Sequence, residues 1–285
     1  MTKSDTVPSA TTAKTQFVEA AGRRIAYRSV GKGAPIILCN RFRGIMDVWD
    51  PAFLDSLAEN YRVITFDYSG FGLSTGEPHT DILKFANDVR DLAEALGFRK
   101  IIVGGWSLGG FVAQIVAIEY PELVTHTILI GTKPPGKNEH PIEQIFFDTA
   151  WKPSNSLEDE IILFFEPASE ASRQAAKMSH DRIARRTTDL SVPIAVNLLD
   201  YFVKGAEDYE ADTYNAREKM TTIKIPILVI SGDHEICFPP QNWFALTRKL
   251  PTTQLIIIPQ AGHGPHHQYP EMVAEYITTF IHNTK

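Results

Sequence analysis

The sequence predicts an α/β fold: a mostly parallel sheet with helices on both faces and an inserted helical cap. Three observations predict it. Apolar strands alternate with amphipathic helices before residue 131 and again after about residue 220. The stretch Ile36–Cys39 is apolar throughout, as strands are when a parallel sheet is covered on both faces. Between these two regions the alternation stops, and only helical patterns remain.

The individual elements follow from local patterns in chain order. Gln16–Ala20 and Arg24–Val30 alternate around a short turn, which predicts a hairpin. The apolar strands that follow are predicted at 36–39, 62–66, 101–106, 127–130, 225–230 and 254–258. Core helices are predicted at 51–60, 81–96, 108–119, 240–250 and 267–281, and cap helices at 142–150, 156–165, 168–179 and 193–203. We therefore expect a disordered tail over 1–15, a core formed by 16–132 and 221–285, and a helical cap over 133–220.

Composition narrows the classes of partner. The 285 residues have 28 basic and 34 acidic side chains, a net charge of −6, which argues against nucleic acid or an anionic membrane as the partner. No apolar run approaches the ~20 residues of a membrane-spanning helix, and residues 1–15 lack the apolar core of a secretory signal. Two cysteines give no disulfide framework. We expect a cytoplasmic monomer or homodimer that acts on a small molecule.

Gly105-Trp-Ser107-Leu-Gly109 matches the G-x-S-x-G pattern of a nucleophile elbow. An apolar strand precedes it and an apolar helix follows, which is the context that this pattern requires. Ser107 is therefore the predicted nucleophile. Gly72-Leu-Ser74-Thr-Gly76 matches the same pattern, but no helix follows it, so Ser74 is predicted to be part of a structural loop.

A serine nucleophile needs a base that is oriented by an acid. His263 follows a buried strand and lies in a glycine loop before the last helix, which makes it the predicted base. The acid is expected between serine and histidine in the chain, where Asp233 and Glu235 follow another strand; spacing alone leaves both open. A metal cluster of His263 with the nearby histidines 266 and 267 is disfavoured, because no H-E-x-x-H helix or cysteine partner accompanies them. No metal or organic cofactor is expected.

These stretches, together with Phe66-Asp-Tyr-Ser-Gly-Phe-Gly-Leu-Ser74, resemble the α/β-hydrolase fold superfamily, in particular its small capped serine esterases, lactonases and haloperoxidase-like members. The resemblance covers nearly everything after residue 16. It implies an eight-stranded type of sheet. In this family the acid usually lies three residues after the loop glycine and four before the proline. Counted from Gly232 and Pro239, both intervals place it at Glu235, with Asp233 as the alternative.

The same resemblance identifies an unusual oxyanion hole. Where the family commonly has His-Gly after the third strand, this chain has Asn40-Arg41-Phe42-Arg43-Gly44. By register, the backbone N–H groups of Phe42 and Leu108 are the expected oxyanion donors. Three alternatives stay open: Arg41, at the position of the glycine, distorts this hole; Arg43 faces the pocket and favours an anionic substrate; or both arginines are exposed or paired structurally. Trp106 is expected to pack beneath the pocket, so Trp106 and Arg43 are the substrate-binding candidates.

The resemblance implies a serine hydrolase that cleaves a carboxylic ester or lactone of a small, largely apolar molecule through an acyl-enzyme. Two alternatives stay open: a cofactor-free perhydrolase or haloperoxidase-like enzyme with the same triad, and a small-molecule receptor on the same fold. Haloalkane dehalogenases and epoxide hydrolases of this fold have an aspartate at the position of Ser107, so their chemistries are disfavoured, and proline iminopeptidases differ around the serine.

Overall fold

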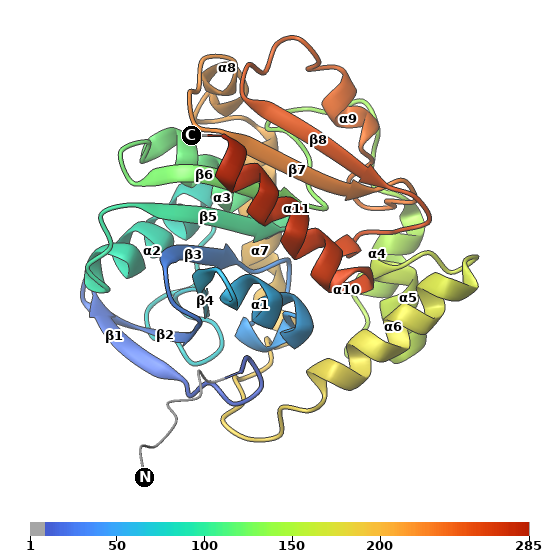
Figure 1. The fold of residues 1–285 in the computed structure, drawn as a ribbon, viewed down its shortest axis with the longest axis horizontal. Coiled ribbons are helices and arrows are strands. Elements are labelled where there is room, and N and C mark those ends of the chain that lie inside the picture. Colours follow the sequence, from blue (N-terminus) through green and yellow to red (C-terminus); the bar gives the residue numbers. More distant parts are fainter. Residues whose placement is uncertain (1–8, 285) are drawn as a thin grey trace.

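The structure, a computed structural model, describes residues 9–284 and contains a sheet of eight strands. Across the sheet they lie in the order β1-β2-β4-β3-β5-β6-β7-β8 (Figure 1). Strand β2 is antiparallel to β1 and β4, and all other neighbours are parallel, which confirms the predicted sheet. The strands are β1 (Gln16–Ala20), β2 (Arg23–Val30), β3 (Ala34–Cys39), β4 (Tyr61–Phe66), β5 (Ile101–Trp106), β6 (Val124–Ile130), β7 (Ile227–Gly232) and β8 (Thr253–Ile258).

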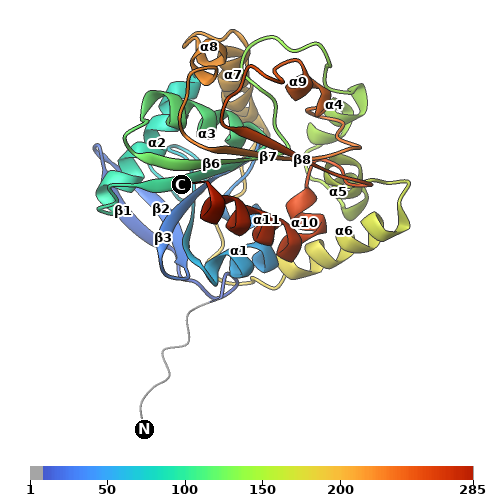
Figure 2. The same cartoon turned by 45° about the horizontal axis from the view of Figure 1, so that its top comes forward.

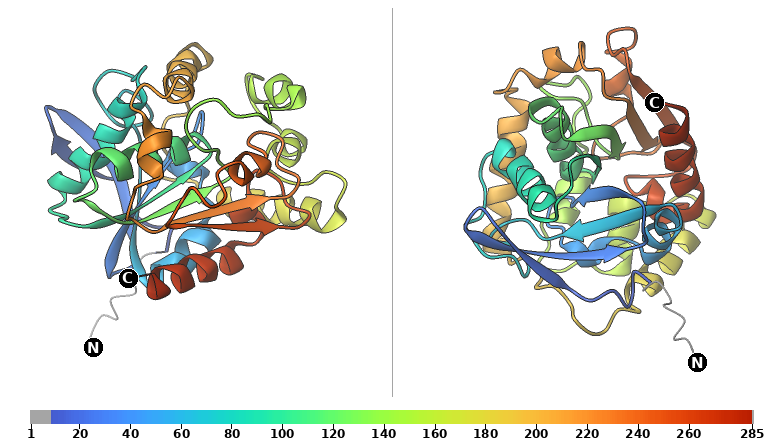
Figure 3. Two further views of the ribbon diagram at one scale, coloured as in Figure 1. Left: turned by 90° about the horizontal axis from the view of Figure 1, so that it is seen from above. Right: turned by 60° about the vertical axis from the view of Figure 1, so that its left-hand side comes forward.

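Helices cover both faces of the sheet. Because successive strand residues point to opposite faces, each strand contributes side chains to the core on either side. In β3, Ile37 belongs to the core formed with α2 (Ile82–Ala95) and α3 (Leu108–Glu119). Its neighbours Ile36 and Leu38 belong to the core formed with α1 (Pro51–Ala58) and α11 (Pro270–Asn283). The left view of Figure 3 shows the blue α1 and red α11 on one side of the strands and the teal and green helices on the other.

Two predicted core helices differ in length from those observed. The helix expected over 240–250 is the short α9 (Gln241–Phe244), followed by turns. The helix expected over 267–281 is divided into α10 (Pro265–Gln268) and α11, with Tyr269 between them in a non-helical conformation. Pro270 causes this division, because proline lacks the N–H that would continue a helix and is favoured at the start of a new one.

The described residues between 133 and 220 form helices and no strand. The helices are α4 (Gln144–Ala150), α5 (Leu157–Phe164), α6 (Glu170–Ile183), α7 (Leu199–Glu210) and α8 (Ala216–Met220), with a 3-10 turn, η2 (Val196–Leu198), before α7. Figures 1 and 2 show α4, α5 and α6 beside α10, near the ends of β7 and β8. In contrast, α7 packs on α2 and α3, and α8 packs on α3. The helical segment is thus two groups of helices and not a single layer.

The prediction of a disordered tail over 1–15 is wrong for residues 9–15, which the structure describes. Residues 1–8 lie outside the described part of the chain, but Ala10 and Ala13 are buried. Arg186, which follows α6, donates hydrogen bonds to the carbonyl oxygens of Ala10 (2.7 Å) and Ala13 (2.8 Å). The Ser-, Thr- and Ala-rich composition suggested disorder, yet small alanine side chains fit against the core, and a distant arginine binds their backbone.

The strand order also separates the two cysteines. Cys39 ends β3 and Cys237 follows β7, and these strands are separated by β5 and β6. Both thiols are free and buried.

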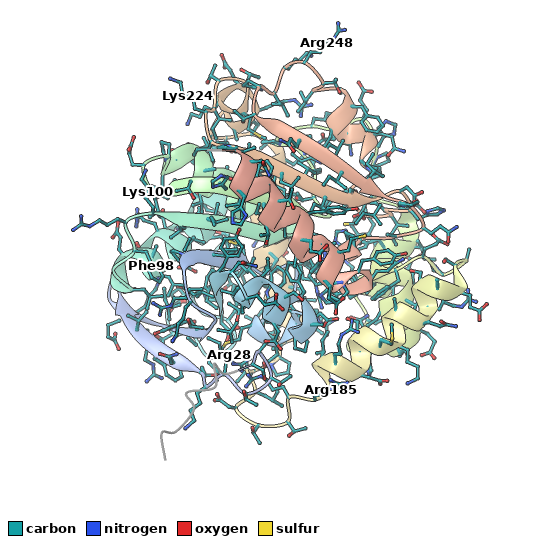
Figure 4. All side chains as sticks on the ribbon, viewed as in Figure 1. Arg28, Phe98, Lys100, Arg185, Lys224 and Arg248 are labelled. Carbon is teal, nitrogen blue, oxygen red and sulfur yellow. The ribbon has the colours of Figure 1, made fainter. Side chains whose placement is uncertain are left out.

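Within residues 9–284, the helices are too short or too polar to cross a membrane. The labelled cationic side chains Lys100, Lys224 and Arg248 belong to loops at the periphery (Figure 4).

Candidate active site

Ser107 stands at the sharp corner between β5 and α3. Its backbone has a φ of 59°, in the left-handed region that only glycine adopts without strain. The corner closes because its neighbours lack side chains. A Cβ on Gly105 would lie 2.0 Å from the carbonyl oxygen of Gly109, and one on Gly109 would lie 2.0 Å from that of Cys39. The sequence therefore fixes a strained elbow at the carboxyl end of β5, as predicted from the pattern.

His263 and Glu235 meet beside this corner. His263 Nδ1 lies 2.7 Å from Glu235 Oε2, and both side chains are essentially inaccessible to solvent. The other carboxylate oxygen accepts hydrogen bonds from the backbone N–H of Cys237 (2.8 Å) and Phe238 (3.1 Å). Trp106 Nε1 donates to the carbonyl oxygen of His263 at 2.8 Å. The loop after β7 thus holds the carboxylate, and the carboxylate holds the imidazole.

Asp233, the alternative acid, lies elsewhere. Its side chain is 39% exposed and contacts Nδ1 of the neighbouring His234 at 2.6 Å. Asp233 lies only two residues before Glu235 in the sequence. The turn after β7 nevertheless directs the two side chains apart, with Asp233 toward solvent and Glu235 into the interior. The geometry therefore pairs His263 with Glu235.

The loop after β3 forms the opposite wall of the site. Asn40 is fully buried, and its side chain donates to the carbonyl oxygen of Phe66 (2.6 Å) and accepts from Trp49 Nε1 (2.8 Å). These bonds anchor the loop at the end of β3. Phe42 then lines the same cavity as Ser107 and His263. The N–H of Leu108 lies at the start of α3, a helix of 12 residues, where the partial positive charge of the helix favours an anion.

Comparison with known proteins places this geometry in a family. The alpha/beta hydrolase fold family matches residues 34–270, more than half of the chain. The chain belongs to the α/β hydrolase fold family. It is similar to the structure of an alpha/beta hydrolase fold protein from Chitinophaga pinensis, at 29% identity and a TM-score of 0.86, over 97% of this chain and 100% of that one.

Two curated relatives have names that indicate different reactions. Proline iminopeptidase PfmaB from Pestalotiopsis fici is 27% identical over 93% of this chain and 99% of its own. A putative non-heme chloroperoxidase from Synechocystis sp. is 27% identical over 90% and 94%. Similarity at this level establishes the family, but the reaction has to be argued from the site.

Gly131 is a residue of this α/β hydrolase site that sequence reasoning did not find. It follows β6, has a φ of 50°, and leaves room for the histidine and acid. A Cβ on Gly131 would lie 3.1 Å from His263 Nδ1, 3.2 Å from Glu235 Oε2 and 2.5 Å from the His263 carbonyl oxygen. The available signal was positional: a glycine at the carboxyl end of β6, the strand between the one that leads to Ser107 and the one that leads to Glu235.

The two arginines of the oxyanion loop have different surroundings. Arg43 has a φ of 58°, and its guanidinium donates to the backbone carbonyls of Lys152 (2.6 Å) and Pro153, which follow α4. Of the two alternatives for Arg43, these bonds favour structural pairing. The guanidinium carbon of Arg41 lies 5.2 Å from the ring centre of Trp106 and 4.7 Å from that of Phe164. Both arginines line the cavity at Ser107. Arg41, which the sequence did not single out as a substrate-binding candidate, is the one whose guanidinium lies against these two rings.

Two cavities lie next to each other at this site. The cavity at the serine has a volume of about 20 Å³; its lining includes Ser107, His263, Phe42, Arg41, Phe146 and Phe164. A second cavity of about 130 Å³ extends between the core and α6; its lining includes Trp106, Phe164, Arg41, Ala176, Ile183 and His267. Arg41 and Phe164 line both, so they form the partition between them. Trp106, a predicted substrate-binding residue, borders the larger cavity.

The nearby histidines form an aromatic cluster. Within residues 9–284 no group of three His, Cys, Asp or Glu side chains is arranged to hold a metal ion. The ring centre of His266 lies 4.6 Å from that of Trp106 and 5.4 Å from that of Trp49. Burial, assisted by His267, His263 and Arg41, lowers the pKa of His266 well below its usual range. A neutral imidazole therefore packs behind Trp106.

Proposed function

We propose that this α/β hydrolase is a serine hydrolase that cleaves a carboxylic ester or lactone of a small, largely apolar molecule through an acyl-enzyme. In this proposal Ser107 is the nucleophile, His263 the general base and Glu235 the acid that orients it. The observation that carries the proposal is the buried contact of 2.7 Å between His263 Nδ1 and Glu235 Oε2, beside a cavity that His263 shares with Ser107.

The contact with Glu235 assigns a task to each imidazole nitrogen. A carboxylate at Nδ1 favours the tautomer with the proton on that nitrogen, which leaves a lone pair on Nε2. Nε2 of His263 is buried and has no hydrogen-bond partner within residues 9–284. It is therefore available to accept the proton of the Ser107 hydroxyl when substrate is bound.

The reaction then proceeds in two halves. Ser107 Oγ bonds to the substrate carbonyl carbon while its proton passes to His263 Nε2, and the carbonyl electrons move to oxygen. The N–H groups of Phe42 and Leu108 stabilise this oxyanion. When the intermediate collapses, the alcohol oxygen leaves with the proton from His263. Water, deprotonated by His263, attacks the acyl-enzyme, and Ser107 regains its proton as the acid departs. In a lactone the alcohol stays attached to the acyl group.

The size of the cavity at the serine supports a role for the neighbouring helices. A volume of about 20 Å³ is close to the space occupied by one water molecule. Phe146 on α4 and Phe164 on α5 line this cavity, so a substrate requires these side chains to move. We therefore propose that the helices α4–α6 of the segment 133–220 act as a cap that opens for the substrate and excludes water during the reaction.

A fluorophosphonate probe tests the nucleophile directly, because it reacts covalently with an activated serine. We expect the wild type and Ser74→Ala to be labelled and Ser107→Ala to be unlabelled, with circular dichroism confirming that each variant is folded. Labelling of Ser107→Ala at the wild-type rate would show that another residue is the nucleophile. Absence of labelling in the wild type would count against a serine hydrolase.

A second candidate reaction uses peroxide as the acyl acceptor. The relative from Synechocystis sp. carries the name of a putative non-heme chloroperoxidase, and a peroxide molecule can replace water in the second half of the same mechanism. A panel of esters and lactones, assayed with and without hydrogen peroxide, separates the two. We expect acid release without peroxide; formation of peracid in preference to acid would establish the second candidate.

A further inference from the structure

Arg41 differs from the ion-paired arginines of this chain. Five others pair with carboxylates: Arg23, Arg28, Arg90, Arg182 and Arg186. Arg41 forms no ion pair within residues 9–284. Its hydrogen bond within that range runs from Nη1 to the carbonyl oxygen of Phe42 (2.8 Å), and its enclosed Nε has no partner there. A guanidinium has five N–H donors and no acceptor, so most of this group's capacity to donate is unused.

The unused N–H donors of Arg41 belong to a residue that lies at the proposed active site. It lines the small cavity with Ser107 and His263 and also the cavity of about 130 Å³ next to it. Its guanidinium carbon lies 5.2 Å from the ring centre of Trp106 and 4.7 Å from that of Phe164, two rings whose planes are inclined at 65° to each other. A group that accepts hydrogen bonds from Arg41 in the small cavity would lie beside Ser107.

Two carboxylates, Asp47 and Glu160, line the larger cavity, but within residues 9–284 neither forms an ion pair with Arg41. Asp47 pairs with Arg28, and Glu160 contacts His180 Nδ1 at 2.9 Å. His267 is neutral at pH 7, because burial, with Arg41 and Arg182, lowers its pKa to about 4 against the opposing effect of Asp50. Burial also lowers the pKa of Arg41 to about 10, which still leaves it protonated at pH 7; Glu160 opposes this shift and Arg43 adds to it.

We propose that Arg41 is a specificity-determining residue that binds a carboxylate group of the substrate, so that the preferred substrates are esters or lactones that also bear a free carboxylate. The carboxylate lies at the junction of the two cavities, and the apolar chain between it and the ester packs on Trp106 and Phe164. This inference rests on the proposed hydrolase function for its reaction, but the carboxylate site itself can be measured as binding without turnover.

The physical basis is a charge-assisted hydrogen bond in a site with little water. Arginine and carboxylate match in geometry and form two parallel bonds. Hydrogen bonds to charged groups contribute more than neutral ones, and a contribution of this kind corresponds to roughly a 10- to 100-fold preference. Contact with two aromatic rings and the hydrogen bond to the Phe42 carbonyl oxygen restrict the guanidinium before the substrate binds, which lowers the entropy cost of binding.

Matched neutral and charged substrates test this preference. Methyl hydrogen glutarate and methyl glutaramate have the same shape and differ in one carboxylate on the acyl side; 4-acetoxybutanoate and 4-acetoxybutanamide differ in the same way on the alcohol side. For the wild type we expect kcat/KM for the carboxylate member of at least one pair to exceed that of its carboxamide by roughly 10- to 100-fold. Equal values in both pairs would overturn the proposal.

Variants of the two neighbouring arginines assign the preference to a residue. Arg41→Gln should reduce the carboxylate-to-carboxamide ratio of kcat/KM to near one, and Arg41→Lys should retain part of the ratio. Arg43→Gln removes a nearby charge whose N–H groups already bind carbonyls, so the ratio should persist. Loss of the ratio in Arg43→Gln and its retention in Arg41→Gln would transfer the site to Arg43 and overturn the proposal for Arg41.

Binding of glutarate by calorimetry separates this inference from the proposed reaction. We expect wild-type protein and Ser107→Ala to bind glutarate more than 10-fold more tightly than Arg41→Gln. If no ester is hydrolysed but this difference holds, the carboxylate site stands and the hydrolase function fails. If esters are hydrolysed and glutarate binding does not depend on Arg41, the hydrolase function stands and the carboxylate site fails.

Discussion

Two stretches of this chain, 72–76 and 105–109, have the same G-x-S-x-G pattern and different structures. Ser74 lies in a loop after β4, and its hydroxyl is fully engaged: it donates to the carbonyl oxygen of Asp67 (2.7 Å) and accepts from the N–H of Ala26 (2.9 Å). Ser107 lies between β5 and α3 with a φ of 59°, beside the histidine–glutamate pair. The pattern supplies small residues for a tight corner in both places, but only Ser107, between its strand and helix, lines a cavity together with His263.

The largest difference between the two serines should appear in turnover. Ser107→Ala removes the proposed nucleophile and should lower kcat by roughly 10⁴-fold or more, whereas folded Ser74→Ala should retain kcat within about 3-fold, because Ser74 does not contact the site. Initial rates on the best ester of the panel, normalised to folded protein, measure this. Comparable losses in both variants would mean that the loop at 72–76 contributes to catalysis.

The acid provides the next contrast. Glu235→Gln replaces the carboxylate at 2.7 Å from His263 Nδ1 with an amide of the same size, which weakens control of the tautomer and no longer stabilises the imidazolium. We expect kcat to fall by roughly 10²- to 10⁴-fold. Asp233→Asn changes an exposed side chain that contacts His234 and should change kcat by less than about 3-fold. The reverse pattern would reassign the acid to Asp233.

How much of the site was predictable depends on what each residue needs from the rest of the chain. Ser107 was predictable because an apolar strand and helix adjoin it in sequence. His263 and Glu235 followed from their positions after buried strands, with the family spacing deciding between the two acids. The surroundings of the two arginines were not predictable. Both line the cavity at Ser107, but Arg43 has a left-handed backbone, and the carbonyls after α4 bind only its guanidinium.

The fold shows the same division between local and long-range information. Strands and most helices followed from periodicity, and the eight-stranded sheet followed from the family. Ala10 and Ala13 are buried, and their carbonyl oxygens bind Arg186, which lies more than 170 residues away in the chain. The sequence contains Pro270, at which the last helix is divided, but the helix predicted over 267–281 ran through it.

Gly131, at the end of β6, provides a further comparison between a position at the site and one outside it. Gly131→Ala places a methyl group 3.1 Å from His263 Nδ1 and requires alanine at a φ of 50°. We expect kcat to fall by about 10- to 100-fold through misplacement of the imidazole, together with a loss of stability on the order of 1 kcal/mol. Gly22→Ala, at a φ of 79° in an open turn with nothing near its Cβ, is the matched control and should lose stability without the loss in kcat.

Ser74→Ala should have the smallest effect on kcat, but it should measurably lower the free energy of unfolding. Ser74→Ala leaves the Ala26 N–H and the Asp67 carbonyl without their partner in a buried position, which should lower the free energy of unfolding by about 1–3 kcal/mol. Ser154→Ala, at an exposed position, should change it by less than about 0.5 kcal/mol. Urea unfolding followed by circular dichroism measures both. If Ser74→Ala unfolds like the wild type, the two hydrogen bonds do not hold the loop, and the distinction between a structural and a reactive serine then depends on the elbow alone.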